Sequence, residues 1–480
     1  MSTPRGARSI IAAATLALAH GCVTIPDDEL ARLDAIERDW QRSVPIEDGR
    51  VYTCVELQEA AIRRHPGLTA TFHRYQAALQ QIVLDGALDD PRVQFGWFLE
   101  SVETRVGSQE WKAGVSQTFP FWGKRDLRAE IALHDAHQLR EQLVEERLRI
   151  ARDVEAEFWN LFFVDASASV LDQQVELLQR LAESIEAQFF AGQTSKADFI
   201  SILMELERQK TARENLEPRR RDAMAGLNAL IDRSPSAPLA LAFADPGTLG
   251  LPAFDPDELI ARARDFGPVQ VQAHRILRQD AAVALAELGW YPDFSVGLDY
   301  IATKGLSPGS GMSVSGNGDD PTVLGFGMNL PIWFDKNEAR VTRAEQLLEA
   351  ERASRRGLIR QAERRAVSAL EQGRRSEQDR VLYADQLLPK AEEKLSLSEQ
   401  DYIGGRVDLD RLIGSERELL DLRLATARAI ADREAALAEL DYLTGGALGR
   451  LPEARPSGAE EIAEAEAMKS SDVSGEGVEP

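Results

Sequence analysis

The sequence predicts a mixed but mostly helical fold: an elongated antiparallel coiled-coil α-barrel whose chain also supplies four strands to a transmembrane β-barrel. Three observations lead to this prediction. Two segments of nearly seventy residues, 124–190 and 335–403, have a helical pattern, and each corresponds to roughly 100 Å of helix. Four shorter segments alternate apolar with other residues, as strands do. The same order of elements occurs twice, which indicates an internal duplication.

Composition excludes several classes of protein. The 480 residues carry a formal net charge of −23 at pH 7. Binding to nucleic acid relies on Lys and Arg facing phosphate, so this charge argues against such a partner. Only two cysteines, Cys22 and Cys54, occur, which excludes a disulfide-rich scaffold. Because no catalytic triad order, phosphate-binding loop or HExxH motif is present, the sequence predicts neither an enzyme nor a cofactor.

The N-terminus has the pattern of an export signal. Arg5 and Arg8 provide a positive start, and a short apolar run over 10–19 follows. The box Leu18-Ala19-His20-Gly21-Cys22 resembles the cleavage site of bacterial lipoproteins. The resemblance implies a signal peptide over 1–21 and a lipid-anchored segment over 22–53, with Cys22 carrying the lipid.

Two further observations concern the membrane. Val23 follows the cysteine, and by resemblance to lipoprotein sorting rules this implies the outer membrane. An ordinary secretory signal with an unmodified Cys22 is the alternative. No later apolar run reaches the ~20 residues that a transmembrane helix needs, so any membrane span must be β or absent.

The duplication is visible in three landmarks. Residues 117–125 (QTFPFWGKR) reappear as 328–336 (MNLPIWFDK), at an offset of 211. Residues 189–193 reappear as 402–406 at an offset of 213, and Leu227 and Leu230 reappear as Leu440 and Leu443 at that same offset. Because these landmarks keep one order and nearly one spacing, the sequence predicts two repeats, 54–235 and 256–446.

Each repeat has the same predicted elements. The first contains a helix over 54–88 that Pro66 interrupts, strands over about 92–100 and 110–119, the helix 124–190 and a return helix over 195–231. The second contains a helix over 256–290, strands over about 292–301 and 321–330, the helix 335–403 and a return helix over 408–443. Segments 101–110 and 302–320 are expected to be exposed loops between paired strands. The proline-rich segment 236–255 is a linker, and the acidic segment 447–480 is expected to be disordered.

Two consequences follow from these elements. Pro218 and Pro389 lie inside helical patterns, and each should kink or break its helix. Four strands cannot close a barrel alone, and an open sheet edge cannot face lipid, so several chains must pool their strands if they span a membrane. A soluble coiled-coil protein with two small hairpins is the structural alternative.

The chain resembles the TolC-like outer-membrane efflux proteins. The resemblance covers about 54–446 and rests on Thr118-Phe119-Pro120-Phe121-Trp122-Gly123-Lys124-Arg125, Asn329-Leu330-Pro331-Ile332-Trp333-Phe334-Asp335, Tyr402-x-x-Gly405-Arg406-Val407 and Leu443-Thr444-Gly445. The strand-to-helix motif resembles the heavy-metal or cation-efflux branch more than the drug branch. The resemblance implies a homotrimer with a twelve-strand barrel in outer-membrane lipid and a helical tunnel in the periplasm.

The same resemblance implies a function and partners. The protein would be the passive outer-membrane channel of a tripartite efflux system, exporting small molecules or metal cations. Its partners would be a periplasmic adaptor and an inner-membrane pump, of the resistance-nodulation-division type. A periplasmic coiled-coil adaptor, or a structural lipoprotein without a pore, is the alternative function. An adaptor would have one helical hairpin flanked by small β domains rather than a duplicated unit.

Candidate functional residues lie where strands meet helices. Pro120 and Pro331 end strands and need no ladder donor there. Trp122 and Trp333 follow, and an amphipathic ring suits a membrane–water interface. Ordinary packing at a corner is the alternative for both tryptophans.

Other candidates lie at the turns farthest from the strands. Gly192 and the pair Gly404 and Gly405 interrupt the long helices, and Ser195 and Asp408 behind them are expected N-caps. The resemblance places these turns at the periplasmic mouth, where they meet the adaptor; a plain helical hairpin without a partner is the alternative. Asp198 and Arg411 occupy matching places in the two repeats and form a candidate gate.

Two histidines are spaced for a shared helix face. His134 and His137 stand at i and i+3. Two ligands do not complete a zinc site. The sequence therefore predicts a pair on the surface and no metal site.

Overall fold

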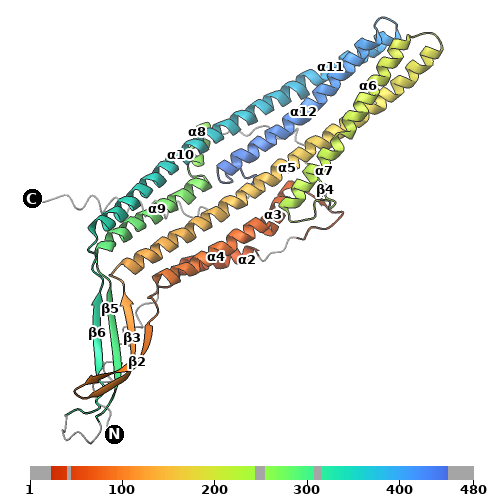
Figure 1. Cartoon of the computed structure of the whole chain (residues 1–480). Helices are drawn as coiled ribbons and strands as arrows, with labels where there is room; N and C mark the ends of the chain where they lie inside the picture. Colours follow the sequence, from red (N-terminus) through yellow and green to blue (C-terminus); the bar gives the residue numbers. More distant parts are fainter. Residues whose placement is uncertain (1–22, 41–44, 244–254, 307–314, 452–480) are drawn as a thin grey trace, which may run out of the picture. The chain divides into compact units, whose positions relative to one another are not determined.

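The computed structural model describes residues 23–40, 45–243, 255–306 and 315–451 (Figure 1). The chain forms two compact units. The first draws on 1–35, 74–139 and 272–354, and the second on 36–73, 140–271 and 355–480. The division falls within several long helices, so these contribute residues to both units.

The described part of the chain is mostly helical. The helices are α2 (Asp27–Trp40), α3 (Cys54–Arg64), α4 (Pro66–Gly86), α5 (Lys124–Phe190), α6 (Lys196–Glu214), α7 (Leu216–Leu230), α8 (Pro256–Ala263), α9 (Gly267–Glu287), α10 (Phe334–Arg380), α11 (Leu388–Ile403) and α12 (Leu409–Leu443), with a 3-10 turn over Leu288–Trp290 and a π-helix over Val381–Leu387. The strands are β1 (Val51–Tyr52), β2 (Arg92–Thr104), β3 (Gly107–Phe119), β4 (Ala240–Leu241), β5 (Phe294–Lys304) and β6 (Thr322–Met328).

The order of elements confirms the predicted duplication. Strands β2 and β3 lead into α5, α6 and α7, and strands β5 and β6 lead into α10, α11 and α12. The mostly helical, duplicated fold that the sequence predicts is therefore confirmed.

The first unit contains a four-stranded antiparallel sheet in the order β2-β3-β5-β6 (Figure 1). The central pair joins the two repeats, because β3 pairs with β5 from Ser108 opposite Lys304 to Phe119 opposite Phe294. Outer strands β2 and β6 each have one ladder edge without a partner strand within the described sheet. A separate short sheet pairs β1 with β4 in parallel.

The first strand hairpin is tighter than the sequence predicts. The expected exposed loop over 101–110 is wrong for most of its length, because β2 continues to Thr104 and β3 begins at Gly107. Thr104 Oγ1 donates to the carbonyl of Gly107 at 2.7 Å across the turn. Strand periodicity was obscured here by the polar residues that continue the pairing.

The second hairpin is partly ordered by side chains. Strand β5 continues to Lys304, and the backbone N–H of Thr303 donates to Oδ1 of Asp320 at 2.7 Å. Asn317 both accepts from and donates to the backbone of Leu306, at 2.7 and 3.1 Å. Residues 307–314 of the predicted loop over 302–320 lie outside the described residues.

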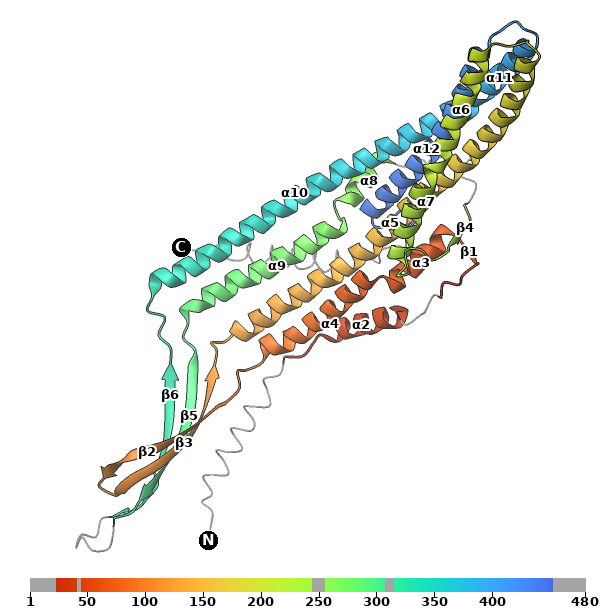
Figure 2. The ribbon, with the colours of Figure 1, turned by 45° about the vertical axis from the view of Figure 1, so that its right-hand side comes forward.

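Helices in the first unit lie side by side in the order α10, α9, α5, α4 (Figures 1 and 2). Polar contacts join each neighbouring pair. Gln279 of α9 donates to the carbonyl of Ala344 in α10 at 3.1 Å, and Arg278 of α9 pairs with Asp135 of α5 at 2.9 Å. The guanidinium of Arg125 in α5 donates to the carbonyl of Gly86, the last residue of α4, at 2.7 and 2.9 Å.

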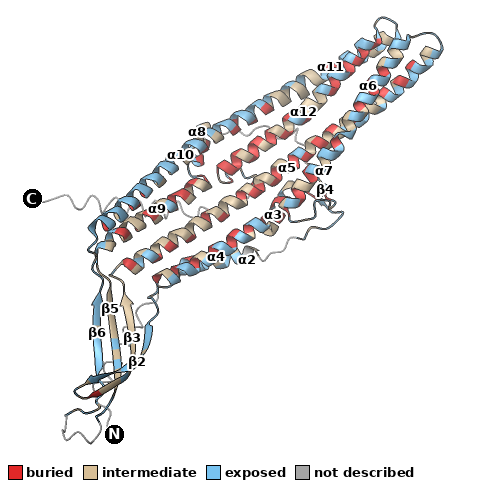
Figure 3. Ribbon diagram, in the orientation of Figure 1, coloured by how far each residue is buried: buried red, intermediate tan, exposed pale blue. Residues whose placement is uncertain are grey.

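The second unit has apolar clusters between its helices. One cluster includes Leu148, Ala151, Leu259, Ala366 and Leu440, and another includes Ile185, Ile202, Leu395, Leu412 and Ile413. Buried positions recur along the facing sides of the helices, while the remaining sides are exposed (Figure 3). This pattern is the amphipathic stripe that drives helix packing.

Both prolines that the sequence places inside helices lie at breaks. Helix α6 ends at Glu214 and α7 begins at Leu216, so Pro218 lies in the first turn of a new helix. Pro389 lies in the first turn of α11, directly after the π-helix. Proline has no N–H to donate and its ring crowds the preceding turn, so the chain restarts its ladder at each site. The predicted interruptions are confirmed, as is the one at Pro66, which opens α4.

The segment predicted to be disordered includes residues that are ordered at its start. Residues 447–451 are ordered, because Oδ1 of the fully buried Asp441 accepts from the N–H of Leu448, and its Oδ2 accepts from those of Arg450 and Leu451, at 2.6 to 2.9 Å. The prediction of disorder over 447–480 is therefore wrong for its first five residues. Residues 452–480, like Cys22 and the predicted signal peptide, lie outside the described residues.

Candidate functional site

The four-stranded sheet exposes large apolar side chains. In the isolated chain, Val93, Phe95, Trp97 and Leu99 of β2 are between 62% and 95% exposed. Leu298 of β5 and Leu324, Phe326 and Met328 of β6 are exposed as well. Alternate residues of a strand point to one face, so β2 and β6 each present an apolar row. A row of this kind is typical of a surface that meets lipid or another apolar partner.

Aromatic rings connect three of the strands. Phe95 of β2 stacks on Trp111 of β3 with ring centroids 5.7 Å apart, and Trp111 contacts Tyr300 of β5 at 5.6 Å. Cross-strand aromatic pairs stabilise a sheet by roughly 0.2–1 kcal/mol each. The aromatic row therefore fixes the register of the sheet across the boundary between the repeats.

The strand–helix junctions place both predicted tryptophans on the surface. Trp122, two residues after Pro120, is 76% exposed, and Trp333, two residues after Pro331, is 70% exposed. Their exposure disfavours the alternative of ordinary corner packing and agrees with rings that face an interface. Trp122 has two ring contacts, with the neighbouring Phe121 at 5.4 Å and with Phe294 at the start of β5 at 5.9 Å.

A set of polar contacts connects the strand–helix junction of the first repeat to the second repeat. Nζ of Lys124, at the start of α5, lies 2.7 Å from Oδ1 of Asp293 and 2.9 Å from the carbonyl of Tyr291. The same Oδ1 accepts from the N–H of Phe121 at 2.9 Å. Lys124 is buried, so these oxygens replace the water contacts that its ammonium group loses. The sequence did not predict these contacts, although Lys124 belongs to the repeated motif.

Replacing Lys124 with methionine should destabilise the folded chain by about 1.5–3 kcal/mol, because Asp293 loses a charge-assisted hydrogen bond in a half-buried place. Lys336→Met is the matched control, since Lys336 stands at the start of α10 and is exposed. Denaturant unfolding of the detergent-solubilised protein measures both. Equal stability of the two variants would contradict the assigned role.

The two hairpin turns have a shared geometry. Gly192 has φ of +71° and Gly405 has φ of +67°, and a β-carbon at either would have no neighbour within 4 Å. The N–H of Gln193 bonds to the carbonyl of Gln188, and that of Arg406 to Asp401, both at 2.8 Å. These bonds close each helix with a left-handed glycine. Gly404 differs, since its φ of −75° is that of an ordinary helix end.

The predicted N-caps are confirmed. Ser195 accepts from the N–H of Asp198, and Asp198 accepts in return from Ser195, which completes a capping box at the start of α6. Hydrogen bonds from Ser195, outweighing a small effect of burial, lower the pKa of Asp198. Asp408 caps α12 by accepting from the N–H of Arg411 at 3.1 Å. The carboxylate of Asp198 thus has a local role that the sequence did not predict.

Among the described ion pairs, none joins Asp198 to Arg411 within this chain. A different pair links the return helices of the two repeats: Arg417 of α12 donates to Glu205 of α6. Glu205 is buried, with a side chain only 2% exposed, and also accepts from Gln209 at 2.7 Å. Burial alone would raise the pKa of Glu205, but the bonds from Arg417 and Gln209 outweigh it and lower that pKa. Only the packing of α6 on α12 reveals this pair, because neither residue belongs to a motif.

The two histidines of α5 are not a surface pair, so that prediction is wrong. Their side chains are 13% and 11% exposed for His134 and His137. Helix α9 lies against this face of α5 and brings a third ring, His274, which is 1% exposed. Histidine is the most frequent metal ligand, and these three rings form the only group of three or more candidate metal ligands found among the described residues.

No helix within the described ranges combines the length and apolar character that a membrane crossing requires.

Comparisons with known proteins place both repeats in one family. A sequence model described as outer membrane efflux protein matches residues 57–232 and 256–446. Among solved structures, a membrane protein from Pseudomonas aeruginosa is similar at 18% identity and a TM-score of 0.69, over 82% of this chain and 90% of that one. The outer membrane protein VceC of Vibrio cholerae is similar at 16% identity and a TM-score of 0.67, over 82% of this chain and 96% of that one.

The open state of the MtrE outer membrane channel of Neisseria gonorrhoeae is similar at 17% identity and a TM-score of 0.67, over 86% of this chain and 96% of that one. At these identities the likeness is one of fold. Comparison with curated protein sequences finds no match.

Proposed function

Because the chain belongs to the outer membrane efflux protein family, we propose that it is the passive channel of a tripartite efflux system, a homotrimer exporting small molecules or metal cations from the periplasm. The observation that carries the proposal is the match of both repeats, each with two strands followed by a long helix and a return helix. The protein is located in the outer membrane and has a large periplasmic part.

The trimer is supported by the sheet. Four strands leave β2 and β6 with free edges, and backbone groups at such edges find no water in lipid. Three copies joined edge to edge would supply twelve strands, and the exposed apolar rows would then face lipid. Trp122 and Trp333 would lie at the interface between lipid and water.

The hairpin turns are the proposed contact with a periplasmic adaptor. Gly192 and Gly405 allow the helices to reverse within a few residues, and a β-carbon at either glycine would have no neighbour within 4 Å. An inner-membrane pump of the resistance-nodulation-division type would supply the energy through that adaptor. The chain itself would then need no catalytic centre.

The proposed function is tested by purifying the full-length protein and adding it to planar lipid bilayers. Stable, step-like conductance from a heat-resistant trimer is the expected result. A monomeric protein that never conducts would overturn the proposal. A strain that lacks the gene should also retain more of the pump's substrates, and the chain should restore their export.

Asp198 and Arg411 are proposed as groups that bias closure at the mouth, now across neighbouring chains of the trimer. An exposed pair contributes about 0.2–1 kcal/mol, so Arg411→Ser should raise the open-to-closed ratio by roughly 1.4- to 5-fold per chain. Single-channel recording measures this ratio. Arg219→Ser, an exposed change on α7, is the control and should have no effect. If both Arg411→Ser and Asp198→Ser leave conductance unchanged, these residues are not the gate.

Lipid attachment at Cys22 is also proposed. Cys22→Ser should abolish incorporation of labelled palmitate, because the thiol is the only acceptor that the cleavage box provides. Cys54→Ser is the control, since Cys54 begins α3 and is half-buried. Mass spectrometry of the mature protein would refute the anchor if Cys22 were unmodified.

A further inference from the structure

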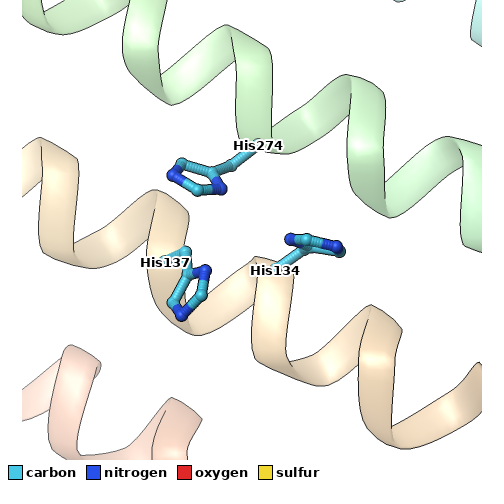
Figure 4. Close-up of side chains that lie close together, drawn as sticks. All are labelled: His134, His137 and His274. Atoms are coloured by element: carbon cyan, nitrogen blue, oxygen red, sulfur yellow. The ribbon is translucent and has the colours of Figure 1, made fainter. Parts of the chain in front are cut away.

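Three histidines from two repeats share one space in the first unit. His134 and His137 lie on α5 in the first repeat, and His274 lies on α9 in the second (Figure 4). Their candidate ligand atoms all lie within 4.8 Å of one another. The ring centroids are separated by 5.0 Å for His137 and His274, and by 5.9 and 6.0 Å for the other pairs. The rings converge although 137 residues separate His137 from His274 in sequence.

A buried carboxylate orients one of the rings. Nε2 of His137 lies 3.2 Å from Oε1 of Glu29, a residue of α2 that is 1% exposed. Oε2 of Glu29 accepts from the hydroxyl of Tyr75 at 2.6 Å, and Oε1 accepts from Arg32 at 2.9 Å. Because Nε2 of His137 faces the carboxylate of Glu29, Nδ1 is the ring atom that remains to bind a metal ion. A metal-binding histidine usually has such a partner for its second nitrogen.

The two helices are held together beside the histidines. Arg278 pairs with Asp135 at 2.9 Å, and Arg275 donates to Gln138 at 3.3 Å. On both helices, the residues that form these two contacts lie about one turn or less from a histidine. The contacts therefore hold α5 and α9 at a fixed spacing beside the three rings. Asp135 also offsets the positive charge of Arg278 near the cluster.

We propose that His134, His137 and His274 bind one divalent transition-metal ion, with Zn²⁺ as its representative. Zinc–nitrogen bonds of about 2.0–2.1 Å place tetrahedral ligand atoms roughly 3.4 Å apart. The candidate ligand atoms, which lie within 4.8 Å of one another, therefore need to approach by at most roughly 1.4 Å. Small rotations of the rings provide this change. A water molecule would fill the fourth position, and Glu29 would orient His137 through Nε2, the nitrogen that does not bind the metal.

The donor set selects the class of ion. Neutral imidazole suits Zn²⁺, Cu²⁺ and Ni²⁺, whereas Mg²⁺ and Ca²⁺ require oxygen ligands. The consequence is a cross-link between α5 and α9, and hence between the two repeats, which adds stability when the ion is bound. This site does not depend on transport, since its ligands are buried between helices.

The test uses the full-length protein in detergent, stripped with EDTA and then dialysed. Titration with Zn²⁺ against a chromogenic chelator should give one ion per chain. His134→Ala and His274→Ala should each weaken binding at least about 100-fold, and Glu29→Gln about 10- to 100-fold. His73→Ala, an exposed histidine on α4, is the matched control and should leave the affinity unchanged.

Co²⁺ provides a second reading that does not rely on the variants' stability. Stripped wild-type protein should develop the visible absorption of tetrahedral Co²⁺ and lose it when Zn²⁺ is added. Circular dichroism of each variant checks folding. Wild-type protein that binds no Zn²⁺ and gives no cobalt spectrum would overturn the site, as would variants that bind as tightly as the wild type. Conductance in bilayers, measured on the same samples, separates this result from the proposed channel function.

Discussion

Arg450→Met is expected to destabilise the folded chain by about 3–5 kcal/mol, since it removes one partner from a buried ionic cluster. The guanidinium of Arg450 donates to both Glu155 and Glu434, and the side chain of each glutamate is only 4% exposed. Without Arg450, the buried carboxylate of Glu155 loses its cation, whereas Glu434 keeps its pair with the buried Arg433. Arg428→Met is the matched control, because Arg428 pairs with Asp432 on the exposed side of α12, the helix that carries Glu434, and this change should cost less than about 1 kcal/mol.

The loss should grow with pH. Burial raises the pKa of Glu155 above its ordinary value of 4.5, and Arg450 opposes that rise. Removing Arg450 therefore moves the folded-state pKa further up. A carboxyl whose pKa is higher in the folded state holds its proton more strongly there, so stability falls as pH rises from the unfolded pKa through the folded one.

Urea unfolding at pH 5 and pH 8 measures this difference. The gap between Arg450→Met and wild type should be smaller at pH 5, where Glu155 is more readily protonated. A gap of the same size at both values would contradict the electrostatic cause. A loss below about 1 kcal/mol at pH 8 would contradict the cluster's role in stability.

Gly107→Ala is the second change expected to have a large effect. Gly107 begins β3 with φ of +134°, and a β-carbon there would lie 2.1 Å from the carbonyl oxygen of Lys304 and 2.8 Å from its carbon. Both atoms belong to the backbone of β5, so the strands must separate. Strain at this φ together with the overlap should cost about 2–6 kcal/mol.

Gly325→Ala is the control from the same sheet, because its β-carbon would come no closer than 3.8 Å to the carbonyl oxygen of Gly297. The amount of folded protein that remains in the outer membrane after extraction with urea measures the result. Gly107→Ala should fall well below wild type, whereas Gly325→Ala should match it. Equal amounts of both variants would mean that the β3–β5 end tolerates the added methyl group.

Much of the fold could be predicted because its signals are local. The duplication, the long helices and the breaks at Pro218 and Pro389 follow from periodicity and from the chemistry of proline. The caps at Ser195 and Asp408 follow from side chains that bond to their own first turn. The predicted end of the first strand near residue 100 was wrong, since β2 continues through polar residues to Thr104.

The candidate sites were predicted unevenly. The exposed positions of Trp122 and Trp333 agree with what the repeated motif suggested. Among the described ion pairs none joins Asp198 to Arg411 within the chain, and Asp198 caps its own helix. The bond from Arg417 to Glu205 links the return helices instead.

The class of each element and the turns follow from the sequence alone, because each depends on residues only a few positions apart, and the repeats follow from motifs that recur at nearly one offset. The tertiary structure alone decided which distant side chains meet. It brought His274 to His134 and His137, and Arg450 to Glu155 and Glu434. The physical reason is that such meetings depend on the rotation and offset with which one helix packs on another. Those quantities are set by the fit of many buried side chains at once.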